Sequence, residues 1–260
     1  MWGTPGLCHA ARPDSACATD AERPARYHAG MILAFVNPEH TLLHPDAPDE
    51  FARVASGLSA LLREAELIPV TGLDEEGLLA VPAVFTSWQV LLHGAVVLTP
   101  DGLEDHAWRR LTLETQAAQE QAMTLAAQAA THLTQLGQLG VDVEVVRRNG
   151  LPLLVRVTHP HGLPLALDEA ERGWREWLDG GPFQTDLRVL RTGETLTLLP
   201  KELTPDSAVN FVLSRLDEQP DLTLGVGAFP SDVGFLEQCD LTIVPPDLLR
   251  RDPATEGDED

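Results

Sequence analysis

A short apolar run that ends abruptly constrains the fold of this chain more than any other feature. Residues 32–36 (Ile-Leu-Ala-Phe-Val) are all apolar, and Asn37-Pro38 follows them directly. A parallel strand has this pattern when both of its faces are buried. Polar side chains follow at Asn37, Glu39 and Thr41, and open α/β sheets bind ligands at the carboxyl ends of their strands. The run therefore predicts a central strand with a site at its end.

Further short apolar runs alternate with helical patterns in the first and last parts of the chain. Strands alternating with helices predict an α/β protein with a parallel sheet and crossover helices. The predicted strands are 67–70, 88–92, 222–226 and 241–244. The predicted helices are 49–62 and 205–216, and the first of them has its buried face at Phe51, Val54, Leu58, Leu61 and Leu62.

The middle of the chain has a different pattern. A long Ala/Gln/Leu-rich helix is expected from Glu104 to Gly137. Strands at 141–146 and 153–157 are joined by Asn149-Gly150, a strong hairpin signal. A helix over 168–178 and a second hairpin over 187–199 complete the segment. The apolar positions expected to face inward on the long helix are Trp108, Leu111, Thr115, Ala118, Ala122, Leu125, Ala129 and Leu133.

These patterns predict a Rossmann-like core from residues 31–103 and 200–248, with an α+β cap inserted at 104–199. Residues 1–30 show no periodicity and are expected to be a disordered extension, and whether they belong to the natural protein stays open. The acidic residues 249–260 are expected to be a disordered tail.

The net charge and the cysteine content limit which partners and which cellular compartment we expect. The formal net charge is −22, which disfavours nucleic acid and anionic membranes as partners. No apolar run approaches the roughly 20 residues of a membrane span. The three cysteines show no metal-binding spacing and suit a reducing compartment, so a cytoplasmic protein is expected.

Four local motifs, in order, resemble those of haloacid dehalogenase-like phosphatases with a large αβ cap, the group that includes sucrose-phosphate, trehalose-phosphate and mannosyl-3-phosphoglycerate phosphatases. The first family motif, Asp-x-Asp-Gly-Thr-Leu-Leu, corresponds to residues 37–43. The resemblance implies that the nucleophilic aspartate is replaced by Asn37 and the general acid by Glu39, while the glycine falls at His40. A carboxamide is a poor nucleophile and brings no charge to a metal.

The second and third family motifs bind phosphate and stabilise its transition state. The second, a strand followed by Thr-Gly, matches Thr71 and Gly72, although Thr71 could instead cap a helix. The register of the third motif puts Pro205 where the family has lysine. Lys201, the only lysine of the chain, lies four residues earlier and is the candidate that remains for binding substrate.

The fourth family motif, Gly-Asp-x-x-Asn-Asp, holds magnesium and corresponds to residues 227–232. Ala228 replaces its first aspartate and Ser231 its asparagine, so only Asp232 remains. Glu39 and Asp232 alone would hold Mg²⁺ weakly, because that ion prefers several hard oxygen ligands. No cofactor is expected, with Mg²⁺ needed only if the protein is active.

Three functions follow from this pattern. The leading hypothesis is a catalytically inactive binding or regulatory protein whose cleft, lined by Asn37, Glu39, Thr71 and Asp232, holds a sugar or sugar phosphate. The first alternative is an active, magnesium-dependent sugar-phosphate phosphohydrolase that uses Glu39 or an altered register. The second is an interaction protein whose protein partner meets the acidic surface.

Overall fold

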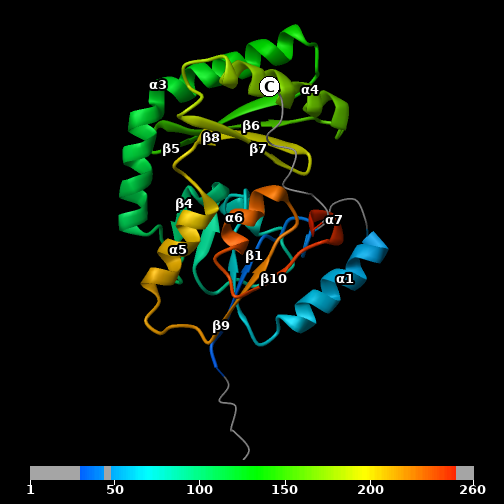
Figure 1. The fold of residues 1–260 in the computed structure, drawn as a ribbon, viewed down its shortest axis with the longest axis vertical. Coiled ribbons are helices and arrows are strands. Elements are labelled where there is room, and N and C mark those ends of the chain that lie inside the picture. The colour runs from blue at the N-terminus through cyan, green and yellow to red at the C-terminus, as the bar shows by residue number, and fades with distance from the viewer. Residues whose placement is uncertain (1–29, 44–47, 250–260) are drawn as a thin grey trace, which may run out of the picture. The chain divides into compact units, whose positions relative to one another are not determined.

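The computed structural model of the chain describes residues 30–43 and 48–249 (Figure 1). The predictions of a disordered extension over 1–30 and a disordered tail over 249–260 lie outside these residues, apart from Gly30 and Leu249. Among the helices described, none combines the length and the apolarity that a membrane crossing needs.

A four-stranded parallel sheet forms the lower half of the molecule in Figure 1. Its strand order is β10-β9-β1-β2, and β1 lies between β9 and β2 as predicted for a buried run. Leu33, Ala34, Phe35 and Val36 have no exposed surface. The strands are β1 (Ile32–Val36), β2 (Glu66–Pro69), β9 (Leu222–Val226) and β10 (Leu241–Ile243).

Two further strands differ from the expected parallel arrangement. β3 (Gln89–Leu91) and β4 (Val96–Leu98) pair with each other antiparallel, and a single bridge from Val70 to Val90 links them to the end of β2. The connection is a single turn over Leu92–Gly94 (η1). A connection this short cannot return a chain to the start of a parallel strand, which needs a crossover of about a dozen residues.

Helices cover both faces of the parallel sheet and connect its strands. In α5 the side chains of Ala208, Val209 and Val212 are buried as predicted. These helices are α1 (Pro48–Leu61), α2 (Glu75–Leu78), α5 (Pro205–Arg215), η2 (Pro230–Asp232), α6 (Val233–Leu236) and α7 (Pro246–Leu249).

The predicted apolar face of α1 is only partly buried. Val54 is 55% exposed and Leu61 is 66% exposed, whereas Leu58 and Leu62 pack against the main apolar cluster. The prediction was wrong at Val54 and Leu61, because only Leu58 and Leu62 of the predicted face contact that cluster. The side chain of Phe51, which was also predicted to face inward, lies outside the described part of the structure.

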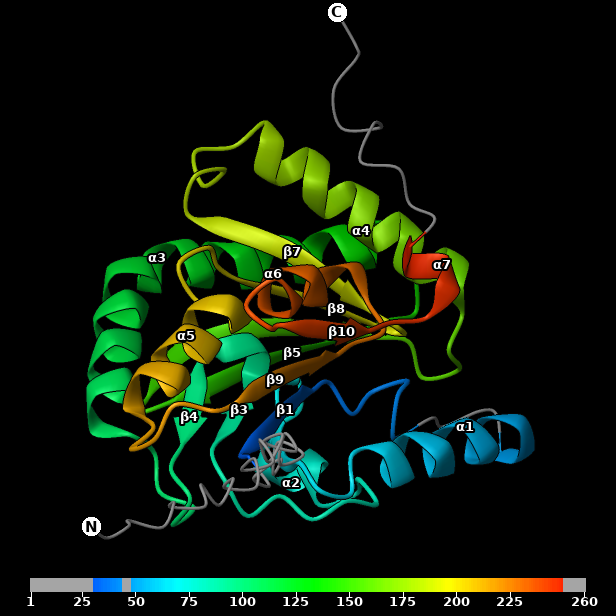
Figure 2. The same ribbon diagram turned by 60° about the horizontal axis from the view of Figure 1, so that its bottom comes forward.

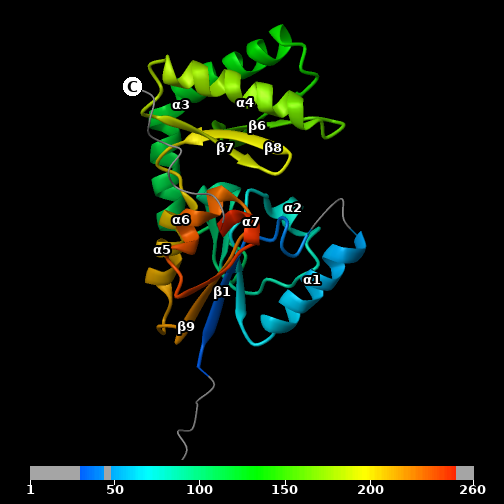
Figure 3. The ribbon, with the colours of Figure 1, turned by 45° about the vertical axis from the view of Figure 1, so that its right-hand side comes forward.

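A separate antiparallel sheet with the order β5-β6-β8-β7 lies above the parallel one (Figures 1 and 3). The turn between β5 and β6 has positive φ angles at Asn149 (53°) and Gly150 (83°), which confirms the predicted hairpin. Its elements are α3 (His106–Leu136), β5 (Asp142–Arg148), β6 (Leu151–Thr158), α4 (Pro164–Asp179), β7 (Leu187–Thr192) and β8 (Thr195–Pro200).

The long helix α3 buries only part of the predicted face: Trp108 and Ala122 are buried as predicted, and Leu133 packs against the apolar cluster of this sheet. Leu111 and Leu125 are 46% and 38% exposed, while Thr112 and Gln116 are buried. Thr112 donates a hydrogen bond to the carbonyl of Ala95, and Gln116 lies against the carbonyls of Arg148 and Leu151. Hydrophobicity alone could not identify this face, because bonds to backbone carbonyls offset the cost of burying its polar side chains.

The antiparallel sheet packs on both sides (Figure 2). Val155, Val157 and Leu196 face α3 and α4, in a cluster that includes Trp174. Leu154 and Leu199 instead join the cluster that contains Val36 and Val226 of the parallel sheet. The inner face of the antiparallel sheet therefore lies directly on the part of the molecule that carries the predicted site.

Candidate functional site

The polar residues predicted from the first, second and fourth motifs meet at the carboxyl ends of β1, β2 and β9. Asn37 follows β1, and its backbone N–H donates to the carbonyl of Val226 at the end of β9. Thr71 follows β2 and donates its N–H to Val90. Asp232 ends the loop after β9. The sheet order therefore gathers residues that are almost 200 positions apart in the sequence.

Asn37 and Asp232 are joined by a buried hydrogen bond. The side-chain Nδ2 of Asn37 donates to Oδ1 of Asp232 over 2.9 Å, and the two residues are 2% and 4% exposed. The other end of the Asn37 amide supports this orientation, because Oδ1 accepts a 3.1 Å hydrogen bond from the N–H of Glu39. Thr41 donates its hydroxyl to the backbone carbonyl of Asn37.

The Asp232 carboxylate has further protein donors. Its Oδ2 accepts hydrogen bonds from the backbone N–H groups of Ala228 (2.8 Å) and Phe229 (2.9 Å). Burial raises the pKa of Asp232 to about 6, although these bonds and the one from Asn37 act in the opposite direction. Both oxygens are therefore already used within the protein.

Glu39 links the end of β1 to the end of β2. Its Oε2 accepts a 2.8 Å hydrogen bond from the Thr71 hydroxyl and a 3.3 Å bond from the N–H of Gly72. The alternative role of Thr71 as a helix cap is wrong, since Asp74 caps α2 by accepting from the N–H of Gly77. The Thr71 hydroxyl lies in the site.

His40, at the position where the resemblance implies a glycine, has a backbone conformation that favours glycine. Its φ angle is 59°, in the left-handed region that glycine enters most easily. Its ring contacts Phe229 edge-on, with centroids 5.1 Å apart, and lies beside Gly193 at the turn of the β7–β8 hairpin. The backbone at this position supports the register assigned to the first motif.

Sequence reasoning missed two residues next to the site. His93 is buried against Gly72, and burial lowers its pKa to about 3. Arg156 of β6 donates a 3.3 Å hydrogen bond to the carbonyl of Gly72. The available signal was a charge inside an apolar strand, because Arg156 interrupts the run Leu153-Leu-Val-Arg-Val157.

Lys201 is not part of this cluster. It follows β8 at the end where Leu187 pairs with Pro200, whereas the turn that contacts His40 joins Thr192 and Thr195 at the other end. Five residues of extended strand separate the two ends by roughly 17 Å. Pro205, at the position of the family lysine, begins α5 and carries no charge.

The residues present do not fit a magnesium site. Asn37 directs a hydrogen-bond donor, Nδ2, at Asp232, and Mg²⁺ requires oxygen ligands there. Both Asp232 oxygens already accept bonds from the protein. Across residues 30–43 and 48–249, no three His, Cys, Asp or Glu side chains are grouped so that they could hold a metal ion.

No protein-family model matches the sequence, and no curated protein resembles it closely enough to count as a relative. Solved structures do match. Sucrose-phosphatase from Synechocystis sp. PCC6803, solved with sucrose and phosphate, is 17% identical, with 85% of this chain and 86% of that chain covered and a TM-score of 0.54.

Two further structures match at similar levels. IMP-nucleotidase from Plasmodium falciparum is 12% identical over 83% of this chain and 63% of that chain, with a TM-score of 0.56. A protein of Thermoplasma acidophilum is 11% identical, with 85% of this chain and 88% of that chain covered and a TM-score of 0.51. At these identities the likeness establishes the fold alone. The chain therefore has the fold of the haloacid dehalogenase-like phosphatases.

Proposed function

We propose that this chain is a binding or regulatory protein that uses a phosphatase fold without phosphatase chemistry. The observation that carries the proposal is the buried hydrogen bond from Asn37 to Asp232. In an aspartyl-phosphate mechanism, a carboxylate at position 37 attacks phosphorus while a metal ion holds it beside the second carboxylate. Here a neutral amide at position 37 donates directly to Asp232.

The remaining groups suit binding better than phosphoryl transfer. Glu39 still offers a carboxyl group, but its Oε2 accepts from Thr71 and Gly72. No lysine lies in the cluster to offset charge that develops on a phosphoryl group. Glu39 and the hydroxyl of Thr71 can both exchange hydrogen bonds with the hydroxyls of a sugar. A neutral sugar is therefore the ligand class proposed for the site.

Contacts between the two sheets would control access to this ligand site. Arg156 of β6 bonds to the carbonyl of Gly72, and Gly193 lies against His40. Asn37 and Thr71 are almost fully buried in this arrangement. We propose that residues 104–199 act as a cap that opens to admit the ligand and closes over it. A cytoplasmic location, expected from the cysteine content, belongs to the same proposal.

The first test is Mg²⁺-dependent phosphatase activity of the full chain, measured with p-nitrophenyl phosphate and with sucrose and trehalose phosphates. The matched variant carries Asn37→Asp, Ala228→Asp and Pro205→Lys. We expect no activity above background in the wild type and a gain in the variant. Turnover by the wild type that is lost in Glu39→Ala and Asp232→Ala would refute the proposal and establish the active phosphohydrolase alternative.

The second test is sugar binding, measured by calorimetry with sucrose and trehalose. We expect saturable binding that Thr71→Val weakens and Thr131→Val leaves unchanged, because Thr131 lies on the exposed side of α3. Equal affinity in both variants would exclude the cleft as the sugar site. If no sugar binds, and protein partners are captured in a strongly salt-dependent manner, the acidic interaction protein becomes the better description.

A further inference from the structure

An exposed helix face without charges lies beside the free edge of the antiparallel sheet. Between Glu120 and Asp142 the chain has no aspartate, glutamate, lysine or arginine. This stretch contains the second half of α3, whose exposed side chains are amides, hydroxyls, a histidine and two leucines. They are Gln121, Thr124, Leu125, Gln128, Thr131, His132, Gln135 and Leu136.

The neighbouring helix α4 shows that this lack of charge is not common to the whole sheet. α4 packs on the same face of the sheet as α3, and its outer side carries ion pairs from Arg172 to Glu169 and Glu176, and from Arg175 to Glu171. The chain as a whole has a formal net charge of −22. Depletion of charged residues is a compositional mark of a surface that another protein covers.

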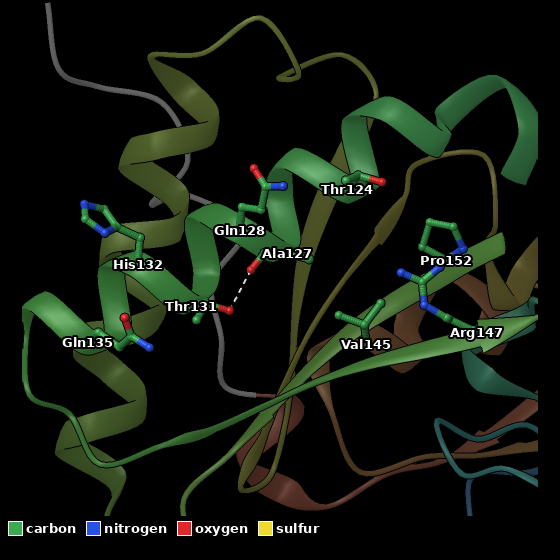
Figure 4. A pocket seen from close by; sticks show the side chains of 9 residues that line it. All are labelled: Thr124, Ala127, Gln128, Thr131, His132, Gln135, Val145, Arg147 and Pro152. Carbon is green, nitrogen blue, oxygen red and sulfur yellow. Dashed lines mark hydrogen bonds between the residues drawn. The ribbon is translucent and has the colours of Figure 1, made fainter. Parts of the chain in front are cut away.

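A groove runs between the uncharged face of α3 and the edge strand β5 (Figure 4). Its volume is about 450 Å³, with Gln128, Thr131 and Gln135 among the residues from α3 and Val145 and Arg147 from β5. Because α3 packs mainly over β6, β5 extends beyond the helix and forms the floor of the groove. The helix face and the edge strand therefore form one continuous surface.

β5 has a long free edge. The strand is 7 residues long and, within the described residues, pairs only with β6. The ladder between the two strands shifts register between Val146 and Arg147, but the extra residue is Leu153 of β6, so β5 itself is uninterrupted. A free edge presents unpaired N–H and C=O groups that can pair with another strand.

The charges of β5 complement a second β5 strand that runs in the opposite direction. Asp142 and Glu144 lie in the first half of the strand, and Arg147 and Arg148 end it. In an antiparallel pair of two copies, the acidic half of each strand lies opposite the basic end of the other, and opposite charges across a strand pair stabilise it. With Val145 on the twofold axis, Asp142 faces Arg148 of the second copy.

We propose that this surface is the interface of a homodimer, in which the β5 strands of two copies pair antiparallel about a twofold axis. Residues opposite each other in paired strands have side chains on the same face, so the axis is perpendicular to the sheet and the two sheets become one. Both α3 helices then lie on one face of the joined sheet. Where they cross β6 and its copy they are three strand spacings, roughly 14 Å, apart, a gap that Gln128 and Gln135 of both copies can span.

Electrostatics favours a second copy as the occupant of this surface. Two molecules of charge −22 repel each other wherever their carboxylates meet. The second half of α3 brings no carboxylate to the contact, and the two signs of charge on β5 balance. Arg148 already binds Glu75 over 2.6 Å, but a guanidinium has further N–H donors for a carboxylate of the second copy. The interface shares no residue with the candidate cleft, so it does not depend on the ligand proposed there.

The test is sedimentation equilibrium of the full chain, from micromolar to near-millimolar concentration at physiological ionic strength. We expect a monomer–dimer equilibrium whose dissociation constant rises roughly tenfold or more in the double variant Gln128→Glu, Gln135→Glu, because the new carboxylates of the two copies face each other. The matched control is Gln184→Glu, Gln219→Glu, which adds the same charge at exposed positions outside α3 and β5. It should leave the dissociation constant nearly unchanged.

Hydrogen exchange of the backbone amides identifies the strand that forms the contact. The free N–H groups within residues 142–148 should exchange more slowly at high protein concentration than at low concentration in the wild type and the control. In the Gln128→Glu, Gln135→Glu variant this dependence on concentration should be lost. A chain that stays monomeric throughout would overturn the proposal. A dimer that both double variants weaken equally, or whose β5 exchange is independent of concentration, would overturn it as well.

Discussion

The side-chain amide of Asn37 donates a 2.9 Å hydrogen bond to the carboxylate of Asp232, and this bond connects the ends of β1 and the loop after β9. Two carboxylates at this distance would repel each other and would need a cation between them. The amide removes the repulsion and satisfies one Asp232 oxygen. The amide at position 37 therefore joins the two elements directly through the protein's own hydrogen bond.

Asn37→Asp should create a need for a cation between residues 37 and 232. We expect the variant to be destabilised by about 1–3 kcal/mol above neutral pH, because a buried bond is lost and two negative charges face each other. Millimolar Mg²⁺ should raise the melting temperature of Asn37→Asp but not that of Asn37→Ala. Equal stabilisation of the wild type by Mg²⁺ in thermal unfolding would show that the native site binds the metal after all.

The raised pKa of Asp232 makes a prediction about acid stability. The folded protein holds this proton up to about pH 6, whereas an unfolded aspartate loses it near 3.8. The folded state therefore binds more protons between these values, and the contribution of Asp232 to stability falls as pH rises from 4 to 6. The shift corresponds to about 3 kcal/mol.

Denaturant unfolding of wild type and Asp232→Asn across this pH range measures that contribution. The wild type should lose about 2 kcal/mol of unfolding free energy relative to Asp232→Asn between about pH 4 and pH 6, which is most of the full effect. A difference that does not vary with pH would mean that the Asp232 carboxylate is ionised throughout.

His93 should make the stability of the fold depend on pH in the direction opposite to that of Asp232. Its pKa is lowered from 6.5 to about 3 because burial and the nearby Arg188 and Arg156 disfavour the charged ring. The unfolded chain then binds the extra proton between these values, so the contribution of His93 to stability is complete above about pH 6.5 and is lost as pH falls. The full effect is on the order of 5 kcal/mol.

Comparison of the wild type with His93→Asn isolates the contribution of His93 to the pH dependence of stability. Asparagine is chosen because it tolerates the positive φ of 56° at this position. Wild type should gain stability between about pH 4 and pH 6.5 relative to the variant, as measured by urea unfolding. Proton NMR titration that finds His93 protonated near pH 6 in the folded protein would contradict the prediction.

The sequence predicted those parts of the fold that local chemistry determines. The run 32–36 could only be a buried strand, and Asn149-Gly150 could only suit a turn with positive φ. Asn37 was found from its place at the end of a strand, because parallel strands bring such ends to one edge, whereas Asp232 was found through the resemblance of residues 227–232 to the fourth family motif. These inferences needed no knowledge of distant contacts.

Other features depended on partners that the sequence does not display. The buried face of α3 carries Thr112 and Gln116, which are acceptable only because carbonyls from other elements lie beside them. The distance of Lys201 from the cluster follows from the pairing of β7 with β8, and the motif register alone left it as a candidate. The same holds for His93, whose role depends on the backbone of Gly72.

Gly72 provides a prediction about how tightly the site is packed. A Cβ atom at this position would lie 2.4 Å from Cε1 of the His93 ring, closer than any real contact. His93 is only 6% exposed, so the ring cannot swing away without displacing its neighbours. Gly72→Ala should therefore cost about 1–3 kcal/mol, the range for overpacking a filled interior.

The matched control is Gly57→Ala in α1, where an added Cβ meets nothing within 4 Å. There the substitution should stabilise the protein by up to about 1 kcal/mol, because alanine favours an exposed helix over glycine. The measurement is chemical unfolding of the two variants beside the wild type. If Gly72→Ala were as stable as Gly57→Ala, His93 would not lie on Gly72, and its depressed pKa would lose the burial that explains it.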